Sequence, residues 1–151
     1  CQAAADLDHA VKEKVKTHPV ARRLMTIPGV GPVVALNFVA LVDDPSRFGR
    51  AENVGAFLGL TPRRYQSGEM DWSGRISKCG DGAMRSLLFE AATTLIVRVK
   101  KFSALKSWAV RLAARRGFAK AAVATARKLA VLMLTLWKTE TEFKWKKEAI
   151  A

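Results

Sequence analysis

The sequence predicts a mainly all-α protein: a helix-hairpin-helix, then a long loop rich in serine and glycine, then three further helices. Three observations predict this fold class. Apolar residues recur every three or four positions over most of the 151 residues, as they do on one face of a helix. Two glycines separate the first pair of apolar helices, and the helical period is lost between residues 60 and 80. Because half of the residues are hydrophobic, the chain can bury the core of one domain.

The first twenty residues predict the end of a longer helix or coiled coil. Apolar residues four positions apart share one face of a helix over residues 1–17, and the sequence opens inside this pattern on Cys1 rather than on Met. We therefore expect residues 1–20 to belong to an upstream element and the domain itself to span residues 21–138.

Proline, glycine and capping residues delimit the helices of this domain. The predicted helices cover residues 20–27, 32–42, 51–58, 81–99, 104–116 and 120–138. Pro28 ends the first of them, because proline cannot continue a helix. Gly59 and Gly117 are C-terminal stops, and Asp81 can cap the helix that follows the loop.

The remaining segments predict irregular structure. Residues 46–50 predict a short loop. Glycine, proline and serine punctuate residues 60–80, which predicts an irregular loop with a short β-hairpin as the alternative. An ordered loop of this length suggests a function. Residues 139–151 predict a charged, frayed end.

The net charge of +13 is concentrated in the second part of the chain. Residues 1–60 carry 7 basic and 6 acidic side chains, whereas residues 61–151 carry 19 and 7. Residues 91–139 contain no Asp or Glu but eleven Lys and Arg: Arg98, Lys100, Lys101, Lys106, Arg111, Arg115, Arg116, Lys120, Arg127, Lys128 and Lys138. Such a segment predicts a nucleic-acid partner and salt-dependent binding, with an anionic membrane surface or a solvated face as alternatives.

Cysteine content and hydropathy exclude several classes of protein. Cys1 and Cys79 are too few for a disulfide scaffold and lack the spacing of a zinc site. No run approaches the roughly 18 apolar residues of a membrane span, and there is no secretory signal. We therefore expect a reduced, cytoplasmic protein with no metal or cofactor in this chain.

A glycine turn joins two apolar helices at Ile-Pro-Gly-Val-Gly-Pro, residues 27–32. Gly29 and Gly31 allow positive φ and let backbone N–H groups approach an anion, and the following helix adds the positive end of its dipole. The turn therefore predicts a contact with a nucleic-acid phosphate that reads no base. The alternative is that both glycines only close a helical hairpin, which Pro28 and Pro32 also favour.

The predicted loop combines hydroxyl groups with positive charge. Its serines are Ser67, Ser73 and Ser77, and the basic residues in and near it are Arg63, Arg64, Arg75, Lys78 and Arg85. Basic side chains suit a transition state in which negative charge spreads over phosphate oxygens, so serine attack on a DNA phosphodiester is chemically sensible. A serine needs a base, however, and His9 and His18 lie far upstream, so no hydrolase triad is predicted. From the residues alone, a structural turn serine is the favoured interpretation, and a serine nucleophile is the alternative.

Four short motifs follow one another along the chain. They read Ile-Pro-Gly-Val-Gly at 27–31, Phe-Leu-Gly-Leu-Thr-Pro-Arg-Arg-Tyr-Gln-Ser-Gly at 57–68, Ser-Lys-Cys-Gly at 77–80 and Leu-Leu at 87–88. In their order and spacing they resemble the C-terminal, serine-bearing domain of the insertion-sequence one-ten family of transposases. The resemblance covers residues 22–137.

The resemblance implies a mechanism shared between two domains. In that family an N-terminal RuvC-like domain with a DEDD set of acids binds Mg²⁺ and works with a C-terminal serine, which attacks DNA and becomes joined to it. Ser67 matches that serine. Family members assemble as dimers and tetramers and are directed to DNA by a bridge RNA. The implied partners are therefore DNA, a bridge RNA, the RuvC-like domain and further copies of the chain, in a bacterial or archaeal cytoplasm and associated with the nucleoid.

Two features depart from the family's pattern. This sequence lacks the DEDD domain, so we expect Mg²⁺ only with that domain and no activity from the isolated chain. Glu69, Met70 and Asp71 stand where the family tends to have small or basic residues. The two acids beside Ser67 would repel phosphate.

The expected function is thus the serine-bearing part of a DNA transposase or site-specific recombinase. Ser67 is the expected nucleophile, with Ser73 and Ser77 as weaker alternatives. The residues expected to contact phosphate or DNA are Arg63, Arg64, Lys78, Arg85, Gly29, Gly31, Arg115 and Arg116. Of the two alternative serines, Ser77 is expected to be structural, because it immediately precedes Lys78 and the start of the next helix. The rival expectation is a non-catalytic helix-hairpin-helix module that binds DNA or RNA.

Overall fold

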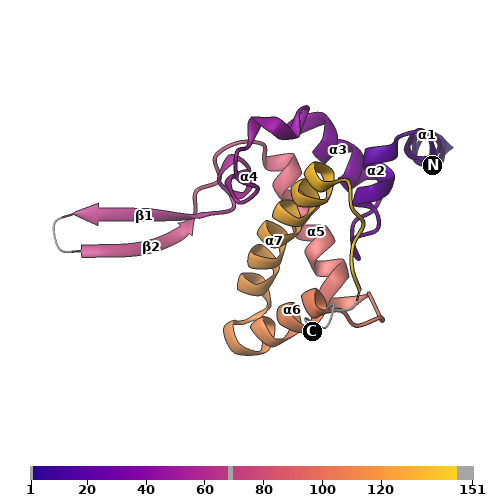
Figure 1. The fold of residues 1–151 in the computed structure, drawn as a ribbon. Helices are drawn as coiled ribbons and strands as arrows, with labels where there is room; N and C mark the ends of the chain where they lie inside the picture. The colour runs from indigo at the N-terminus through magenta and orange to yellow at the C-terminus, as the bar shows by residue number, and fades with distance from the viewer. Residues whose placement is uncertain (1, 68–69, 146–151) are drawn as a thin grey trace, which may run out of the picture.

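Seven α-helices and one two-stranded hairpin make up the described part of the chain. The computed structural model describes the backbone of residues 2–67 and 70–145, and their side chains except for residues 63–74. The elements are α1 (Gln2–Lys16), α2 (Pro19–Leu24), α3 (Pro32–Val42), the 3₁₀ helix η1 (Pro45–Arg47), α4 (Asn53–Phe57), β1 (Pro62–Ser67), β2 (Met70–Ile76), α5 (Gly82–Val97), α6 (Ala104–Arg116) and α7 (Phe118–Thr139). The helices form the body, and the hairpin projects from it as an arm on the side away from α1 (Figure 1). The predicted mainly α-helical class is confirmed.

The long helix α7 is the centre of the body. It packs against α5 and α6 and also contacts α2 and α4. Leu129, Met133 and Leu134 of α7 are fully buried in one core with Leu88 and Leu95 of α5. The lysines and arginines of α7 are exposed, so the helix has an apolar inner side and a basic outer side. No helix in the described ranges, α7 included, is long and apolar enough to cross a membrane.

Side-chain caps set the starts of three helices. The Asp81 carboxylate accepts a hydrogen bond from the N–H of Met84 at 2.8 Å and so caps α5, as predicted. The Ser103 hydroxyl caps α6 in the same way, and the imidazole of His18 caps α2. The helices α3 and α6 have the predicted bounds.

The helix α2 ends earlier than predicted. The sequence predicts a helix up to Ile27, whereas α2 ends at Leu24. Pro28 disfavours helical backbone in the residue before it. The Thr26 hydroxyl also donates a hydrogen bond to the Arg23 carbonyl at 2.7 Å, a local bond that competes with continued helical structure.

A 3₁₀ helix occupies part of the segment predicted as a loop over residues 46–50. The Asp44 carboxylate accepts a hydrogen bond from the Ser46 N–H at 2.9 Å, and this bond holds the pKa of Asp44 below its usual value. Nearby boundaries differ slightly from the prediction: α4 is shorter, and α7 begins two residues earlier.

The predicted serine loop forms an antiparallel β-hairpin, the alternative that the sequence offers for it. The register pairs Pro62 with Ile76 at the root and Ser67 with Met70 at the far end. It shifts between Pro62 and Arg64, as at a β-bulge. Ser67 therefore lies at the end of the arm farthest from the body.

Beyond α7 the chain turns back onto the body. The Phe143 N–H donates a hydrogen bond to the Thr26 hydroxyl at 2.9 Å, and the rings of Phe143 and Trp145 are 5.2 Å apart. This contact joins the end of the described chain to the turn between α2 and α3. The rest of the predicted charged end, residues 146–151, lies outside the described residues.

Candidate nucleic-acid interface

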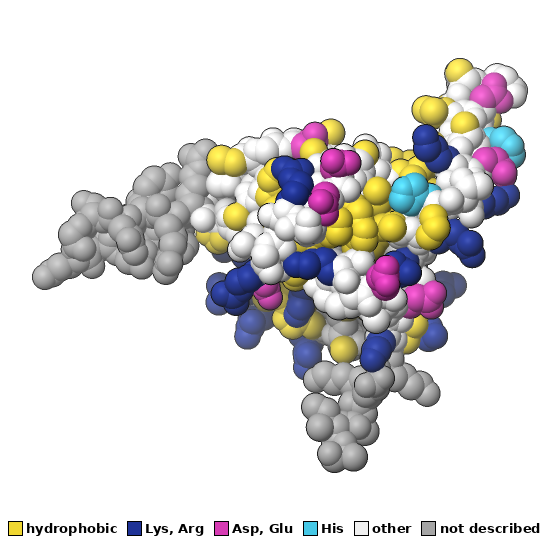
Figure 2. Space-filling model, turned by 45° about the horizontal axis from the view of Figure 1, so that its top comes forward, with side chains coloured by type: hydrophobic (Ala, Val, Ile, Leu, Met, Phe, Trp, Pro, Cys, Tyr) yellow, Lys and Arg dark blue, Asp and Glu magenta, His cyan; other side chains and the backbone are white. Residues whose placement is uncertain are grey.

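A cleft lies between the root of the hairpin and the helices α6 and α7. It has a volume of about 860 Å³. It is lined by Leu60, Pro62, Arg75, Ile76, Lys78, Arg116, Ala119, Lys120, Val123, Ala124 and Arg127. Five of these residues are basic, and none is acidic or aromatic; we call it the basic cleft. Lys and Arg side chains gather along the lower edge of the body in Figure 2, on the side from which the arm projects.

Two glycines hold the root of the hairpin against the end of α4. A Cβ at Gly59 would lie 2.2 Å from the Cys79 carbonyl oxygen, and one at Gly80 would lie 2.3 Å from the Phe57 carbonyl oxygen. Both glycines also have positive φ, at 72° and 86°. Only glycine fits such positions. Because the Lys78 N–H donates to the Gly59 carbonyl at 3.1 Å, this close approach fixes the backbone of Lys78 beside the cleft.

The other wall of the cleft is formed where α6 turns into α7. Arg116 is the last residue of α6, and Gly117, with φ of 90°, reverses the chain. Lys120 and Arg127 are seven residues apart on α7, which places them on one face about two turns apart. The aliphatic part of Arg127 lies over α4, since a Cβ at Gly55 would be 3.1 Å from its Cγ. Arg116, Lys120 and Arg127 are thus exposed on helices whose other faces are buried in the core.

The five cations of the cleft have no carboxylate partner among the described side chains. The ion pairs seen in that part of the chain are Asp8–Lys12, Glu13–Lys16 and Arg50–Glu52. All three are exposed and lie away from the cleft lining. Five like charges around one hollow repel one another, and a bound polyanion relieves that repulsion. A concave surface of this kind fits a strand of phosphates better than a flat membrane.

Ser67 and Lys78 lie at opposite ends of the hairpin. Ser67 lies five residue steps along β1 from Pro62 at the root. At a rise of about 3.3 Å per residue, the arm is about 17 Å long. This separation sets Lys78 and Ser67 apart within a single chain, and their joint action on one phosphate stays a prediction. The side chains of Arg63 and Arg64 lie outside the described ones, so their contacts stay a prediction.

The two alternative serines occupy different places in the hairpin. Ser73 pairs with Arg64 within the strands, and its side chain is among those not described. Ser77 follows β2: its N–H donates to the Thr61 carbonyl at 2.9 Å, and its hydroxyl accepts a weak hydrogen bond from the Cys79 N–H at 3.4 Å. These contacts agree with a structural role for Ser77.

Arg85 braces the hairpin root from outside the cleft. Its Nη1 donates to the carbonyl oxygens of Leu58 at 3.2 Å and Cys79 at 2.9 Å. These bonds tie α5 to the end of α4 and to the segment after β2. Arg85 lines a smaller hollow with Phe89 and Glu90, which adjoins the basic cleft and shares three lining residues with it. Arg85 does not line the basic cleft, and its predicted phosphate contact stays a prediction.

The two glycines of the turn between α2 and α3 have different surroundings. Gly29 has φ of 89°, and a Cβ there would lie 2.6 Å from the Ala91 carbonyl oxygen, so this glycine lets the turn pack against α5. Gly31 begins α3, and nothing lies within 4 Å of a Cβ placed there. Neither glycine lines the basic cleft. Their contacts with phosphate stay predictions.

Basic residues of the acid-free segment have several different roles. Arg116 lines the cleft, whereas its neighbour Arg115 does not. Lys106 is buried and donates from Nζ to the Val99 carbonyl, and Lys138 donates to the Phe48 carbonyl at 2.7 Å. These two lysines stabilise the fold.

Sequence reasoning did not select three of the five cleft cations, namely Arg75, Lys120 and Arg127, as site residues. A signal for two of them is present on α7. Lys120 and Arg127 flank Val123 and Ala124 with the spacing of one helix face. Arg75 is one of the basic residues of the predicted loop, but its place in the cleft follows from the hairpin, whose register no local pattern specifies.

The helical body and its acid-free cleft have the features of a protein that binds nucleic acid. The sequence pattern of the family described as "Transposase IS116/IS110/IS902 family" matches residues 21–108, more than half of the chain. The chain belongs to this family, which confirms the resemblance stated above.

Curated relatives carry consistent names. Over 136 residues the chain is 37% identical to "Transposase for insertion sequence element IS1111A" of Coxiella burnetii, covering 89% of this chain and 37% of that protein. It is 32% identical over 138 residues to "Probable family 20 transposase" of Pseudomonas aeruginosa, covering 91% and 41%. It is 30% identical over 111 residues to "Pilin gene-inverting protein" of Moraxella lacunata, covering 70% and 34%. The chain thus spans between 34% and 41% of the length of these relatives.

Proposed function

We propose that this chain is the part of a DNA transposase or site-specific recombinase that holds nucleic acid and supplies the serine for strand cleavage and exchange. One observation carries the proposal: the arm that bears Ser67 is rooted in a cleft with five cations and no acid. The names of the relatives support the same activity, since two are transposases and one is a gene-inverting protein.

The basic cleft binds the phosphate backbone of the nucleic acid in this proposal. It has cations at both walls and no acidic side chain, which suits contacts with phosphate oxygens. Binding by five cations releases counterions, so the logarithm of the duplex binding constant should fall with the logarithm of salt at a slope of about −4 to −5.

Ser67 acts as a nucleophile on a phosphodiester. Its Oγ forms a bond to phosphorus while one P–O ester bond to the sugar breaks. The serine proton passes to a base, and the departing oxygen takes up a proton and becomes a free hydroxyl. The new phosphoserine diester retains an ester bond, so a hydroxyl of another strand can attack it, release Ser67 and reseal the DNA.

The groups that activate Ser67 come from outside the arm. His18 caps α2 and His9 lies on the exposed helix α1, so neither is placed to act as its base. The described residues contain no group of three or more His, Cys, Asp or Glu that could hold a metal ion. On the resemblance, we assign Mg²⁺ and its DEDD ligands to a RuvC-like domain of the whole protein, and no step of the proposal is derived through that metal.

The phosphate held in the cleft differs from the one that Ser67 attacks. The arm is about 17 Å long, which matches about five base pairs of duplex at 3.4 Å per step. The cleft thus anchors the nucleic acid, and the arm reaches a phosphate about five positions away. On the resemblance alone, we also propose that a bridge RNA selects the DNA and that the protein works as a dimer or tetramer.

The test is a search for a serine-linked DNA adduct with the whole protein, its N-terminal part included. End-labelled element DNA is incubated with the protein, denatured and run on a gel. The wild type should give a slow, protease-sensitive band. Ser67→Ala should abolish this band while native DNA binding changes less than twofold.

Ser73→Ala and Ser77→Ala are the matched controls in the same arm, and both should keep the band. An adduct that persists in Ser67→Ala would show that Ser67 is not the nucleophile. Loss of the band in Ser73→Ala alone would assign that role to Ser73.

The second candidate is a non-catalytic binding module, favoured by the distance between Ser67 and the cleft cations. This function predicts salt-dependent nucleic-acid binding through the cleft and no adduct in the wild-type protein under any divalent cation. The same gel therefore separates the two candidates.

A further inference from the structure

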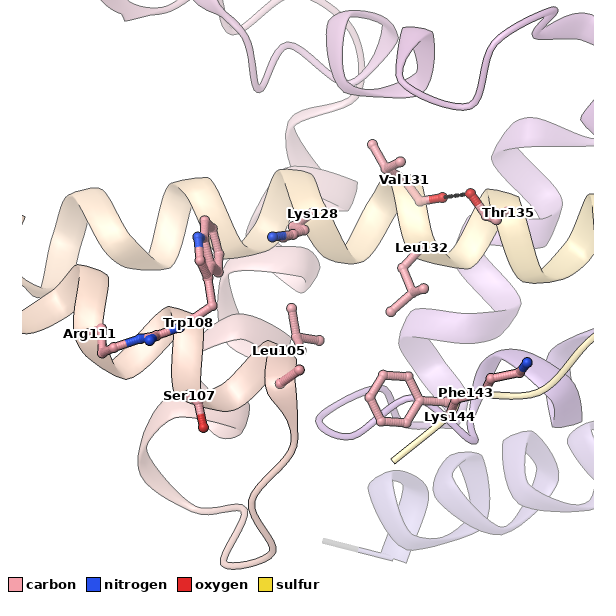
Figure 3. A pocket seen from close by; sticks show the side chains of 11 residues that line it. Leu105, Ser107, Trp108, Arg111, Lys128, Val131, Leu132, Thr135, Phe143 and Lys144 are labelled. Carbon is pink, nitrogen blue, oxygen red and sulfur yellow. Dashed lines mark hydrogen bonds between the residues drawn. The ribbon is translucent and has the colours of Figure 1, made fainter. Parts of the chain in front are cut away.

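A second hollow lies on another side of α7, between α6, α7 and the segment after Thr139 (Figure 3). Its volume is about 540 Å³. It is lined by Ala104, Leu105, Ser107, Trp108, Arg111, Lys128, Val131, Leu132, Thr135, Phe143 and Lys144. We call it the Trp108 pocket. It shares no lining residue with the basic cleft.

The Trp108 pocket combines aromatic and aliphatic side chains with positive charge. In Figure 3, Leu105 and Trp108 come from α6, Leu132 comes from α7, and Phe143 closes a third side. Arg111, Lys128 and Lys144 add cations, and no lining residue is acidic. The Lys128 Nζ lies 3.9 Å from the centre of the Trp108 ring. Such a pocket fits a ligand that is planar at one end and anionic at the other.

We propose that the Trp108 pocket binds an unpaired nucleobase of single-stranded nucleic acid together with its phosphate. The base lies against the indole of Trp108 and the apolar wall, and the phosphate contacts Arg111 and Lys128. Proteins that bind single strands stack bases on aromatic side chains next to cations that follow the backbone. A volume of about 540 Å³ lies within the usual range of pockets for small ligands. A paired base inside a duplex is stacked on both sides and cannot enter.

The contact between Lys128 and Trp108 is compatible with this occupant. Lys128 is exposed and Trp108 is half-buried, and a cation over a ring that reaches the surface is held weakly. A phosphate offers the ammonium group a charge-assisted hydrogen bond, which is stronger. Lys128 therefore turns to the phosphate and leaves the ring face to the base. An acidic peptide with an aromatic side chain has related chemistry. The pocket cations Arg111 and Lys128, however, belong to the same acid-free segment as the cations on the helical wall of the basic cleft, which favours nucleic acid.

The experiment measures binding of the 151-residue chain to three probes of equal length. They are a single-stranded RNA, a single-stranded DNA and a duplex DNA, each with one 2-aminopurine. Quenching of 2-aminopurine reports stacking, and anisotropy of an end label reports affinity. Trp108→Leu should weaken single-strand binding about 5- to 100-fold and remove the quenching, because it removes base–aromatic stacking. Duplex affinity should change less than twofold.

Matched variants separate stacking from folding and from charge. Trp108→Phe keeps a ring and should retain most of the quenching. Lys128→Gln should weaken single-strand binding, whereas Lys101→Gln should not, although Lys101 also lies over a tryptophan, Trp145, at 4.5 Å. Lys101 does not line the pocket.

Several outcomes would overturn the proposal. They are an absence of quenching in the wild type, an equal loss of duplex and single-strand affinity in Trp108→Leu, and displacement of the probe by an acidic aromatic peptide at lower concentration than by unlabelled single strand. A preference for single-stranded RNA over single-stranded DNA, or the reverse, supports the proposal and identifies which nucleic acid the pocket binds. Because no residue of the arm or the basic cleft is changed, the outcome is independent of the proposed role of Ser67.

Discussion

The basic cleft and the Trp108 pocket use neighbouring residues of one helix in different ways. Arg127 lines the cleft and Lys128 lines the pocket. Consecutive residues point about 100° apart around a helix, so the two cations stand in different surroundings. Arg127 lies over the small residue Gly55, among aliphatic side chains, whereas Lys128 lies over the ring of Trp108.

The difference shows that positive charge alone does not define a site. A hollow with cations and no aromatic ring can hold phosphates of any sequence. A hollow with a ring and an apolar wall adds a place for a base. Both hollows take cations from residues 91–139, the acid-free segment, which looks like a single basic region in the sequence.

The largest expected effect separates the two hollows by their response to duplex DNA. Lys120→Glu combined with Arg127→Glu should lower duplex affinity about 100-fold or more at fixed salt, because two charge-assisted phosphate contacts become repulsive. Arg111→Glu combined with Lys128→Glu should lower it less than tenfold. Anisotropy titrations with one duplex measure both. Equal losses in the two double variants would mean that the hollows act as one surface.

A second effect tests whether the hairpin root shapes the cleft. Gly59→Ala should lower the free energy of unfolding by about 2–4 kcal/mol, because the new methyl group meets the Cys79 carbonyl at a positive φ. The control Gly31→Ala has open space and φ of −98°, so its change should stay within about 0.5 kcal/mol. Urea unfolding measures both. A neutral Gly59→Ala would show that the root is not held by this close approach.

The smallest expected effect tests where the binding surface of the cleft ends on α6. Arg116→Gln should weaken duplex binding about tenfold and reduce the salt slope by about 1, because one phosphate contact is lost. Arg115→Gln should change affinity less than threefold, because Arg115 does not line the cleft. Salt titrations of the two variants give the comparison. A larger effect at Arg115 would move the interface to the outer side of α6.

Local sequence signals predicted most of the helical fold. The bounds of α3 and α6 follow from Pro32 at one start and Gly117 at the other end, and the cap of α5 from Asp81. Where two local preferences competed, the prediction was less accurate. The apolar pattern continued to Ile27, but the proline after it ended the helix earlier.

The candidate site was only partly predictable, because it depends on contacts between distant segments. The cleft forms where residue 78 meets residues 116–127, and no local pattern specifies that meeting. A basic residue type also does not reveal whether the side chain binds a ligand or stabilises the fold. Arg85 donates to backbone carbonyls and Lys106 is buried, yet in the sequence both look like phosphate ligands. Conversely, Ser67 was selected as the candidate nucleophile through the family resemblance, and the hairpin register sets it apart from Lys78.

The most direct test of the account measures the salt dependence of binding for two variants side by side, Lys120→Glu with Arg127→Glu and Trp108→Leu. Each is titrated with a duplex and with a single strand of equal length. The account predicts that the cleft variant lowers the duplex slope by about 2, whereas Trp108→Leu weakens single-strand binding without changing the duplex slope. A cleft variant with an unchanged duplex slope would contradict the claim that these cations hold the nucleic-acid backbone.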